Sequence, residues 1–140
     1  MIVDKTDLST SQVWSNIDQT LIGATAQSSW DGLSNSNAIV AQSGHTSSAA
    51  ALCLNSTNGG QSDWYLPSIL ECNLLWNNYY SVLNTLSQIP GATILTSSYY
   101  WCSTEDSSGF MAGGQSFSDG SSGLGSNKSN QFHVRAIRSF

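Results

Sequence analysis

The residue types that most often carry chemistry are few in this chain and lie far apart. Cys53, Cys72 and Cys102 show no CxxC or Cys/His spacing, so motifs for zinc binding and thiol redox chemistry are absent. His45 and His133 have no ligand-like neighbours in the sequence. We therefore expect the cysteines to be small buried apolar residues and the histidines to have surface or capping roles.

The carboxylates form no catalytic or calcium-binding group either. Glu71 is explained by a capping box at the start of a helix, and we expect Glu105 to pair with Arg135 or Arg138. Glu105 and Asp106 are the only adjacent carboxylates. Calcium binds about six to eight oxygen ligands, so one such pair is too little. The sequence therefore predicts a protein that is not an enzyme and needs no metal or other cofactor.

Composition and charge exclude two classes of partner. The formal net charge is −5 with only four lysines and arginines, so no basic stripe could neutralise the phosphates of a nucleic acid. No apolar run approaches the ~20 residues of a membrane-spanning helix, so we expect no direct insertion into a membrane. The 140 residues suffice for one core, and we treat residues 1–140 as a single ligand-binding domain.

Small neutral polar residues replace the missing charges. Only 9% of the residues are charged, well under the usual ~25%. Surfaces rich in Ser, Asn, Thr and Gly are typical of secreted and virion proteins. They are also typical of antibody paratopes, where such residues make adaptable contacts between aromatic anchors. Residues 1–11 are polar and form no signal peptide. We expect a domain cut from a larger protein that is exposed on a virion or a cell surface.

The clearest local pattern predicts a helix after Pro67. Ser68 and Glu71 form a capping box, in which each side chain accepts a hydrogen bond from the backbone amide of the other residue. Apolar residues then recur at spacings of three and four up to Ile89. We expect one core-facing helix with a break near residues 77–78.

The other segments complete an α+β order. Residues 13–24 predict one or two short strands around a turn. Residues 37–54 predict a broken helix whose second part is capped by Ser48. From residue 93 onward, aromatic clusters alternate with Gly and Ser and predict strands and long loops. The order of strands, two helical regions and strands predicts the α+β class and not an alternating βαβ fold.

Residues 106–133 are the most unusual part of the chain. They are rich in Ser and Gly, as a flexible linker would be, but are punctuated by Phe110, Met111, Phe117, Leu124 and Phe132. One interpretation is a set of solvated hairpin loops with the aromatic residues pointing inward. The other is a recognition surface of small polar residues with a few exposed apolar anchors. We favour the recognition surface.

Four segments of the sequence resemble one protein family. They are residues 59–68 (GGQSDWYLPS), 71–76 (ECNLLW), 100–105 (YWCSTE) and 134–140 (VRAIRSF). In this order they resemble the Lcl C-terminal domain family, found at the C-termini of bacterial collagen-like adhesins, other surface proteins and phage proteins. The family is similar to the C-type lectin fold. The resemblance implies two helices packed on a twisted, mostly antiparallel sheet with adjacent N- and C-terminal strands.

The sequence departs from the family pattern at two cysteines. Cys72 stands where Leu is usual, and Cys102 stands where Ser is usual. We expect both positions to be enclosed and to lie near each other, and the sequence leaves open whether they form a disulfide. The Glu-Pro-Asn and Trp-Asn-Asp calcium motifs of sugar-binding C-type lectins are absent. We therefore expect no calcium-dependent sugar site.

A subset of the family resembles the variable proteins of diversity-generating retroelements. In these proteins the adenines of a template are rewritten, typically within AAC codons. Each rewritten codon then has the form NNC, where N is any base, so only residues with an NNC codon can result. Within residues 106–133 the residues without such a codon are Met111, Gln115, Lys128 and Gln131. Positions that match the framework of the family are Gln115, Phe117, Gly120 and Lys128. The resemblance implies that Gly109 is diversified together with our ligand-binding candidates, which are Asp106, Ser107, Ser108, Phe110, Ser116, Ser118, Asp119, Ser121, Leu124, Ser126 and Ser129.

We interpret the chain as a display scaffold that binds a protein or glycan on a cell surface, as a monomer or a trimer. Two alternatives stay open. In the first, the same segment forms the subunit contacts of a trimeric adhesin tip that is not diversified. In the second, the chain is a relative of the formylglycine-generating oxidases, which resemble the same fold. That reaction needs a reactive cysteine pair in a cleft, which Cys72 in a helix and Cys102 in a strand do not suggest.

Overall fold

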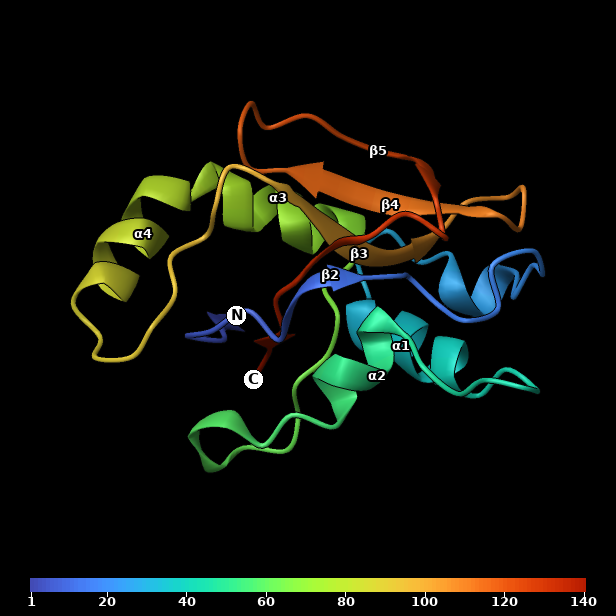
Figure 1. The fold of residues 1–140 in the computed structure, drawn as a ribbon, viewed down its shortest axis with the longest axis horizontal. Helices are drawn as coiled ribbons and strands as arrows, with labels where there is room; N and C mark the ends of the chain where they lie inside the picture. Colours follow the sequence, from blue (N-terminus) through green and yellow to red (C-terminus); the bar gives the residue numbers. More distant parts are fainter.

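The chain has an α+β fold in which the helices precede most of the strands (Figure 1). The computed structural model describes residues 1–140. In chain order the elements are β1 (Ile2–Val3), β2 (Ser9–Gln12), α1 (Gly32–Val40), α2 (Ala49–Leu54), α3 (Ile69–Asn77), α4 (Tyr79–Ser87), β3 (Tyr99–Glu105), β4 (Met111–Ser116), β5 (Ser122–Asn127), β6 (Phe132–Val134) and β7 (Ile137–Arg138). None of the helices has the length and apolar character needed to cross a lipid bilayer. The predicted fold class is confirmed.

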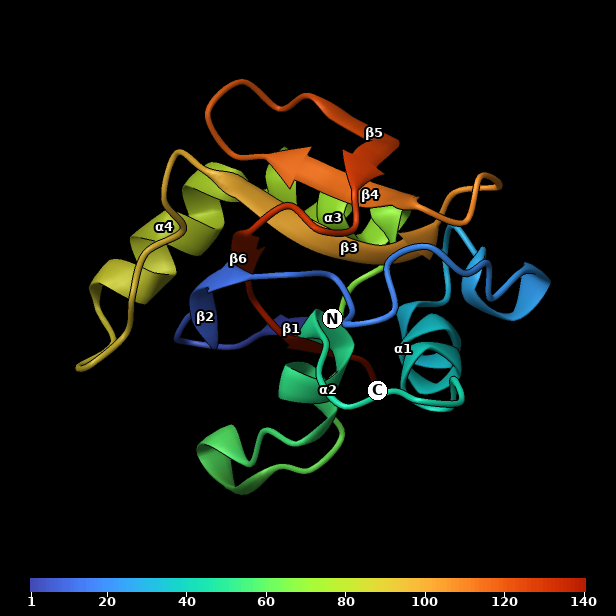
Figure 2. The same ribbon diagram turned by 45° about the vertical axis from the view of Figure 1, so that its right-hand side comes forward.

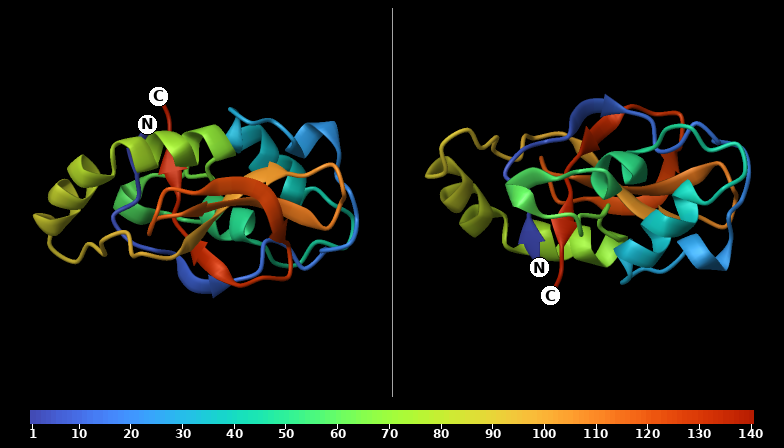
Figure 3. Two further views of the ribbon diagram at one scale, coloured as in Figure 1. Left: turned by 90° about the horizontal axis from the view of Figure 1, so that it is seen from above. Right: turned by 90° about the horizontal axis from the view of Figure 1, so that it is seen from below.

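Two sheets place the ends of the chain side by side. Five strands form one sheet in the order β2-β6-β3-β4-β5, in which only β3 and β6 run parallel. β1 and β7 form a separate antiparallel pair, with Ile2 opposite Arg138 and Val3 opposite Ile137. Figures 2 and 3 show both termini beside this pair. The expected adjacency of the first and last strands is therefore confirmed.

The helices follow the predicted caps and breaks. The Ser68 hydroxyl accepts from the Glu71 amide at 3.4 Å, and the Glu71 carboxylate accepts from the Ser68 amide at 2.8 Å. The predicted break near residues 77–78 separates α3 from α4. Helices α1 and α2 are the two parts of the predicted broken helix, and Ser48 caps the second part. Helix α1 begins earlier than predicted because Asp31 caps it. Helix α3 covers one face of the larger sheet (Figure 2).

The predicted strands at residues 13–24 are wrong. Strand β2 ends at Gln12, and the next segment is a loop with a single bridge, between Ser15 and Ser48. Trp14 is fully buried, and its indole N–H donates to the Cys102 carbonyl at 2.8 Å. Trp14 is thus buried by the packing of a loop and not by pairing in a sheet, while Leu21 of the same segment is exposed.

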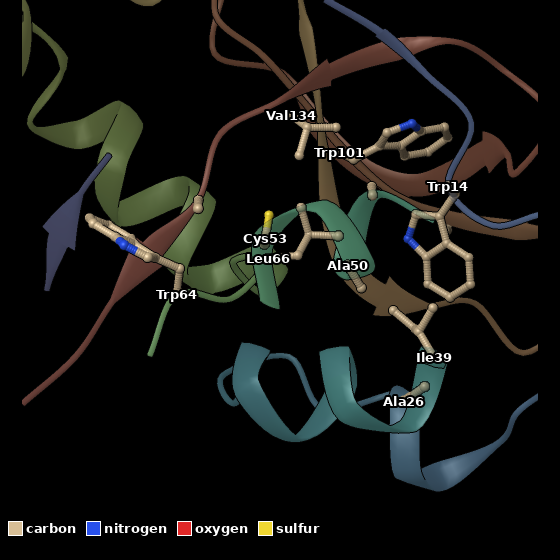
Figure 4. Packing of buried hydrophobic residues seen from close by; sticks show 12 residues of the cluster. Trp14, Ala26, Ile39, Ala50, Cys53, Trp64, Leu66, Trp101 and Val134 are labelled. Carbon is tan, nitrogen blue, oxygen red and sulfur yellow. The ribbon is translucent and has the colours of Figure 1, made fainter. Parts of the chain in front are cut away.

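Two apolar clusters hold the elements together. The larger cluster joins α1, α2, β3 and β6, and its members include Trp14, Ile39, Leu66, Trp101 and Val134 (Figure 4). The smaller cluster lies on the side of the sheet that α3 covers, and consists of Leu75, Leu95, Tyr100 and Phe117. The neighbours Tyr100 and Trp101 belong to different clusters because side chains alternate across a strand. Strand β3 is therefore buried on both faces.

A buried arginine binds the last segment to the N-terminal segment. Arg135 is 2% exposed. Its Nε donates to the Asp7 carboxylate at 2.6 Å, and one terminal nitrogen donates to the Asp4 carbonyl at 2.8 Å. The other terminal nitrogen donates to the Thr93 carbonyl at 2.8 Å. Residues from both ends of the chain are therefore needed to satisfy one buried charge.

The expected pairing of Glu105 with Arg135 or Arg138 is wrong. Glu105 binds Lys128 at 2.6 Å, whereas Arg138 binds Asp63 at 2.7 Å. The physical reason is the sheet order. Glu105 ends β3 next to the β4–β5 hairpin, while both arginines lie in the closing segment beside the N-terminus.

Deleting residues 133–140 should abolish cooperative unfolding. The deletion removes Arg135 and three buried apolar residues, Val134, Ala136 and Ile137. Thermal unfolding followed by circular dichroism measures this, and the matched control is deletion of Phe140 alone, which is 94% exposed. A truncated protein that melts as sharply as the full chain would contradict the role of the closing segment.

Candidate functional site

Most candidate residues lie on β5 and on two turns that flank β4, while Ser116 ends β4 and Ser129 follows β5 (Figure 1). The first turn, residues 106–110, joins β3 to β4, and the second turn, residues 117–121, joins β4 to β5. Strand β4 has six residues, so about 20 Å of extended chain separates the two turns. The structure therefore brings the candidates together in two groups and not in one continuous patch.

The backbone of the first turn is fixed by local contacts. The Asp106 carboxylate accepts from the Ser108 amide at 2.9 Å, and this hydrogen bond holds the pKa of Asp106 below its usual value. Gly109 has a φ of +85° and packs against the backbone of Leu21. A side chain at residue 109 would be strained and would collide with Leu21. Gly109 is thus a structural glycine, and the implied diversification at this position does not fit the structure.

The side chains around Gly109 are open to solvent. Ser107, Ser108 and Phe110 are exposed, and Asp106 is partly exposed. Ser129 belongs to the same group, because the amide of the preceding residue donates to the Phe110 carbonyl at 3.0 Å. Five of the candidates therefore gather at this end of β4.

The second turn holds three candidates, and a fourth, Ser116, ends β4 and is buried. Ser116 is 1% exposed, and its hydroxyl lies 2.9 Å from the Ser118 hydroxyl. The Asp119 carboxylate accepts from the Ser121 amide at 3.0 Å and from the Ser121 hydroxyl at 2.8 Å. The hydrogen bond from the Ser121 amide lowers the pKa of Asp119. Ser118, Asp119 and Ser121 are accessible to a partner, whereas Ser116 is a structural residue at the end of β4.

A bulge points Leu124 and Ser126 to opposite faces of β5. Between two pairs of the β4–β5 ladder, β4 advances by two residues while β5 advances by three. Leu124 therefore lies beside Gly113, on the side of the sheet that α3 covers, while the Ser126 hydroxyl lies beside Gly114 on the other side. The two candidates do not share a face, although they are two residues apart.

A groove of about 280 Å³ lies on the face of Ser126, and we call it the β5 groove. Its lining residues come from β3, β4, β5 and the second turn, and they are Tyr99, Gly114, Ser121, Ser122, Gly123, Gly125 and Ser126. The Tyr99 side chain is 47% exposed and stacks on the Phe132 ring, with 5.2 Å between centroids. The walls therefore consist of serine hydroxyl groups, the backbone of glycines, and the Tyr99 ring, which packs on Phe132.

Most residues of the β5 groove are not among the candidates. Only Ser121 and Ser126 belong to both sets. The reasoning from the sequence missed Tyr99 because it precedes the Ser/Gly-rich segment. The alternation of Tyr99, Tyr100 and Trp101 in a predicted strand was a signal that could have found it, because such alternation places Tyr99 and Tyr100 on opposite faces.

The framework residues Gln115, Phe117, Gly120 and Lys128 are structural. The Gln115 side-chain amide donates to the carbonyls of Ser116 and Gly120 at 3.1 Å each, and so closes the second turn. Gly120 has a φ of +80°, and a Cβ there would overlap the Trp76 indole. Phe117 is 2% exposed and packs in the smaller cluster. These contacts hold the second turn onto α3.

A buried ion pair holds the first turn. Lys128 and Glu105 have fully buried side chains and are 2.6 Å apart. The Lys128 ammonium also donates to the Gly109 carbonyl at 2.6 Å. The Glu105 carboxylate accepts from the amides of Ile22 at 3.0 Å and Gly23 at 2.9 Å. Both charges are therefore satisfied, and they connect the end of β5 to the first turn and to the loop before α1.

Neither histidine belongs to a hydroxyl–imidazole–carboxylate triad, since His133 Nδ1 lies 3.3 Å from the Asp7 carboxylate but has no hydroxyl as a hydrogen-bond partner. His45 Nε2 lies 2.8 Å from the Ser48 hydroxyl, but this hydroxyl caps α2 and accepts from the Ala51 amide at 3.0 Å. No carboxylate hydrogen-bonds to His45 as a third catalytic group would. No three His, Cys, Asp or Glu side chains are close enough to hold a metal ion.

A larger hollow of about 650 Å³ lies between α1 and the loop before it. It contains none of the candidate residues. Its residues are Ile17, Thr20, Leu21, Ile22, Thr25, Asn37, Ala38, Ala41, Gln42 and Ser43. It meets residues 106–133 where Gly109 packs against Leu21 and where the Lys128 ammonium donates to the Thr20 carbonyl at 3.3 Å.

Comparison with known proteins gives one match. The family model described as the Lcl C-terminal domain matches residues 5–138. This range contains the β5 groove and every candidate residue. No curated protein and no solved structure matches the chain significantly.

Substitutions should separate the exposed positions from the core. Phe110→Asn and Asp119→Asn should each change the free energy of unfolding by less than about 0.5 kcal/mol, because both side chains face solvent. Phe117→Ala and Trp101→Ala should each cost ~3–5 kcal/mol, because these rings are 2% and 1% exposed. Denaturation by urea measures all four variants. If Phe110→Asn costs as much as Phe117→Ala, the first turn belongs to the core and is no recognition surface.

Proposed function

We propose that this chain, which belongs to the Lcl C-terminal domain family, is a ligand-binding display domain. The observation that carries the proposal is the β5 groove, a hollow of about 280 Å³ with hydroxyl groups, open backbone and an aromatic ring in its walls. Binding sites of this kind orient a ligand with a few placed polar groups around an apolar contact. The function is recognition, without a chemical step.

The β5 groove suits a neutral polar ligand with a flat apolar face. Tyr99 offers one ring face, because its other face stacks on Phe132, and a ring fixed in this way loses little conformational entropy on binding. Hydroxyl groups of Ser121, Ser122 and Ser126 can each donate and accept a hydrogen bond. No charged side chain lines the groove. A sugar ring or a neutral peptide segment has this combination, so we propose a glycan or protein of a cell surface as the partner.

We also propose a C-type-lectin-like topology and a position on a virion or cell surface, within a larger protein. The pairing of β1 with β7 and the packing of helices on a mostly antiparallel sheet support the topology. The family match and the low content of charged residues support the location.

Diversification of the exposed positions is a further part of the proposal. The separation of exposed candidates from buried framework residues supports it, since exposed side chains can change without loss of the fold. Gly109 and Ser116 are exceptions. Both are buried, so replacing them would alter a turn and not the recognition surface.

The two alternatives make different use of the same residues. A trimeric adhesin tip would bury β5 and the two turns between subunits, so its mass in solution would be three times that of one chain. An oxidase would need its cysteine pair in a cleft, and Cys72 and Cys102 are enclosed between α3 and β3. This burial argues against the oxidase and leaves the adhesin tip to be tested by light scattering.

Binding should depend on Tyr99. We expect the labelled chain to bind members of a glycan array or of a peptide display library, and Tyr99→Ala to weaken this binding about tenfold or more because the aromatic anchor is lost. Tyr80→Ala is the matched control, since Tyr80 is 83% exposed on α4 and lies outside the β5 groove. Equal losses in the two variants, or no binding to either library, would contradict the proposal.

If the exposed positions are diversified, a template copy of the coding stretch should lie near the gene. We expect a near-identical copy of the stretch that encodes about Tyr99 to Phe140 close by, next to a reverse transcriptase gene. The copy should differ from the coding repeat almost only at its adenines, while the codons of Trp101, Phe117 and Val134 agree, because changing them would damage the core. Sequencing of the locus checks this. Absence of the copy, or mismatches spread over all four bases, removes diversification from the proposal and leaves ligand binding in place.

A further inference from the structure

Two of the cysteines meet between α3 and β3. Cys72 on α3 is 2% exposed, and Cys102 on β3 is 0% exposed. The Cys102 thiol donates to the Cys72 sulfur, and the two Sγ atoms are 2.8 Å apart. Unbonded carbon atoms, which are smaller than sulfur, pack at about 3.5–4.0 Å. The two sulfur atoms are therefore closer than a pair of free thiols would settle, which agrees with the expectation that they lie near each other.

We propose that Cys72 and Cys102 form a disulfide that fastens α3 to β3. A sulfur–sulfur bond measures about 2.04 Å, so the atoms need to approach by only about 0.8 Å from their 2.8 Å separation. The two thiols lose two protons and two electrons. A small disulfide oxidant, such as oxidised glutathione, takes them up through a mixed disulfide and leaves as two thiols.

The third cysteine stays outside this pair. Cys53 lies on α2 and is a member of the larger apolar cluster. Cys72 belongs to the helix on the other face of the sheet. The one sulfur atom within hydrogen-bond distance of the Cys72 sulfur is that of Cys102. The pairing is therefore unambiguous, and Cys53 keeps its free thiol.

Burial makes the bond structural and not a reversible switch. Desolvation raises the pKa of the Cys72 thiol well above its usual value, and the contact with Cys102 raises it further. The thiolate is the form that exchanges with disulfides, so an enclosed pair reacts slowly. We expect the bond to form while the chain folds and then to be shielded from reductants.

The bond closes a loop that contains α4 and the segment leading to β3. The two cysteines are 30 residues apart. Closing a loop of this length removes many conformations of the unfolded chain and should raise the melting temperature by roughly 10 °C. The bond also ties the central strand β3, which carries Tyr99, to the helix behind it.

The test uses the full chain refolded in a buffer of oxidised and reduced glutathione. Free thiols are then blocked with iodoacetamide in denaturant, and the chain is cleaved after Glu71 and Glu105, its two glutamates. Cys53 falls on the peptide 1–71, whereas Cys72 and Cys102 share the peptide 72–105. We expect one alkyl group on the first peptide, and on the second none and a mass lower by two hydrogens.

Two variants serve as controls. Cys53→Ala should keep the bond and the difference in melting temperature between oxidised samples and samples that were reduced with a phosphine in denaturant and refolded in its presence. Cys102→Ser should leave one alkyl group on Cys72 and lose that difference. Two alkyl groups on peptide 72–105 of the wild-type chain, a link between the two peptides, or equal melting temperatures of its oxidised and reduced forms would each overturn the proposal.

Discussion

The buried pair of Lys128 and Glu105 is the interaction on which the candidate surface depends. Taking a charge out of water is costly unless the charge is paired and hydrogen-bonded. Here the ammonium and the carboxylate bind each other, and their remaining hydrogen bonds go to backbone groups, including the Gly109 carbonyl and the Gly23 amide. One interaction therefore fixes three segments that are distant in sequence: the end of β3, the end of β5 and the loop before α1.

The contacts that anchor the two turns to the rest of the fold are made to backbone groups of the turns, whereas the Asp106 and Asp119 carboxylates bond only within their own turns. Lys128 binds a carbonyl of the first turn, and Gln115 binds carbonyls of the second turn. A carbonyl is present whatever side chain its residue carries. The side chains of Ser107, Ser118 and similar positions can therefore differ without loss of these hydrogen bonds, and this is the physical basis on which a display function is reasonable.

Local features of the fold could be predicted from the residues themselves, whereas the long-range contacts that were predicted, between the terminal strands and between Cys72 and Cys102, came from the family resemblance. The capping box at Ser68 and the break between α3 and α4 depend on residues a few positions apart, and both predictions are confirmed. The partner of Glu105 was missed because Lys128 lies in a Ser/Gly-rich segment, where a lysine is usually solvated. The opposite orientations of Leu124 and Ser126 depend on a bulge, which Gly123 and Gly125 permit but whose register the sequence does not specify. The alternation of Tyr99 and Tyr100 along a predicted strand could place them on opposite faces, but the strand order is needed to bring Tyr99 beside Ser126 in the β5 groove.

The bulge in β5 also bears on how the molecules behave at high concentration. Strand β5 is the last strand of its sheet, so the outer N–H and C=O groups have no neighbouring strand. It contains no proline and no charged residue, which are common means of preventing such an edge from pairing with another copy. A bulge twists a strand and interrupts its regular spacing. The irregular register of β5 therefore protects against edge-to-edge aggregation while its side chains stay accessible.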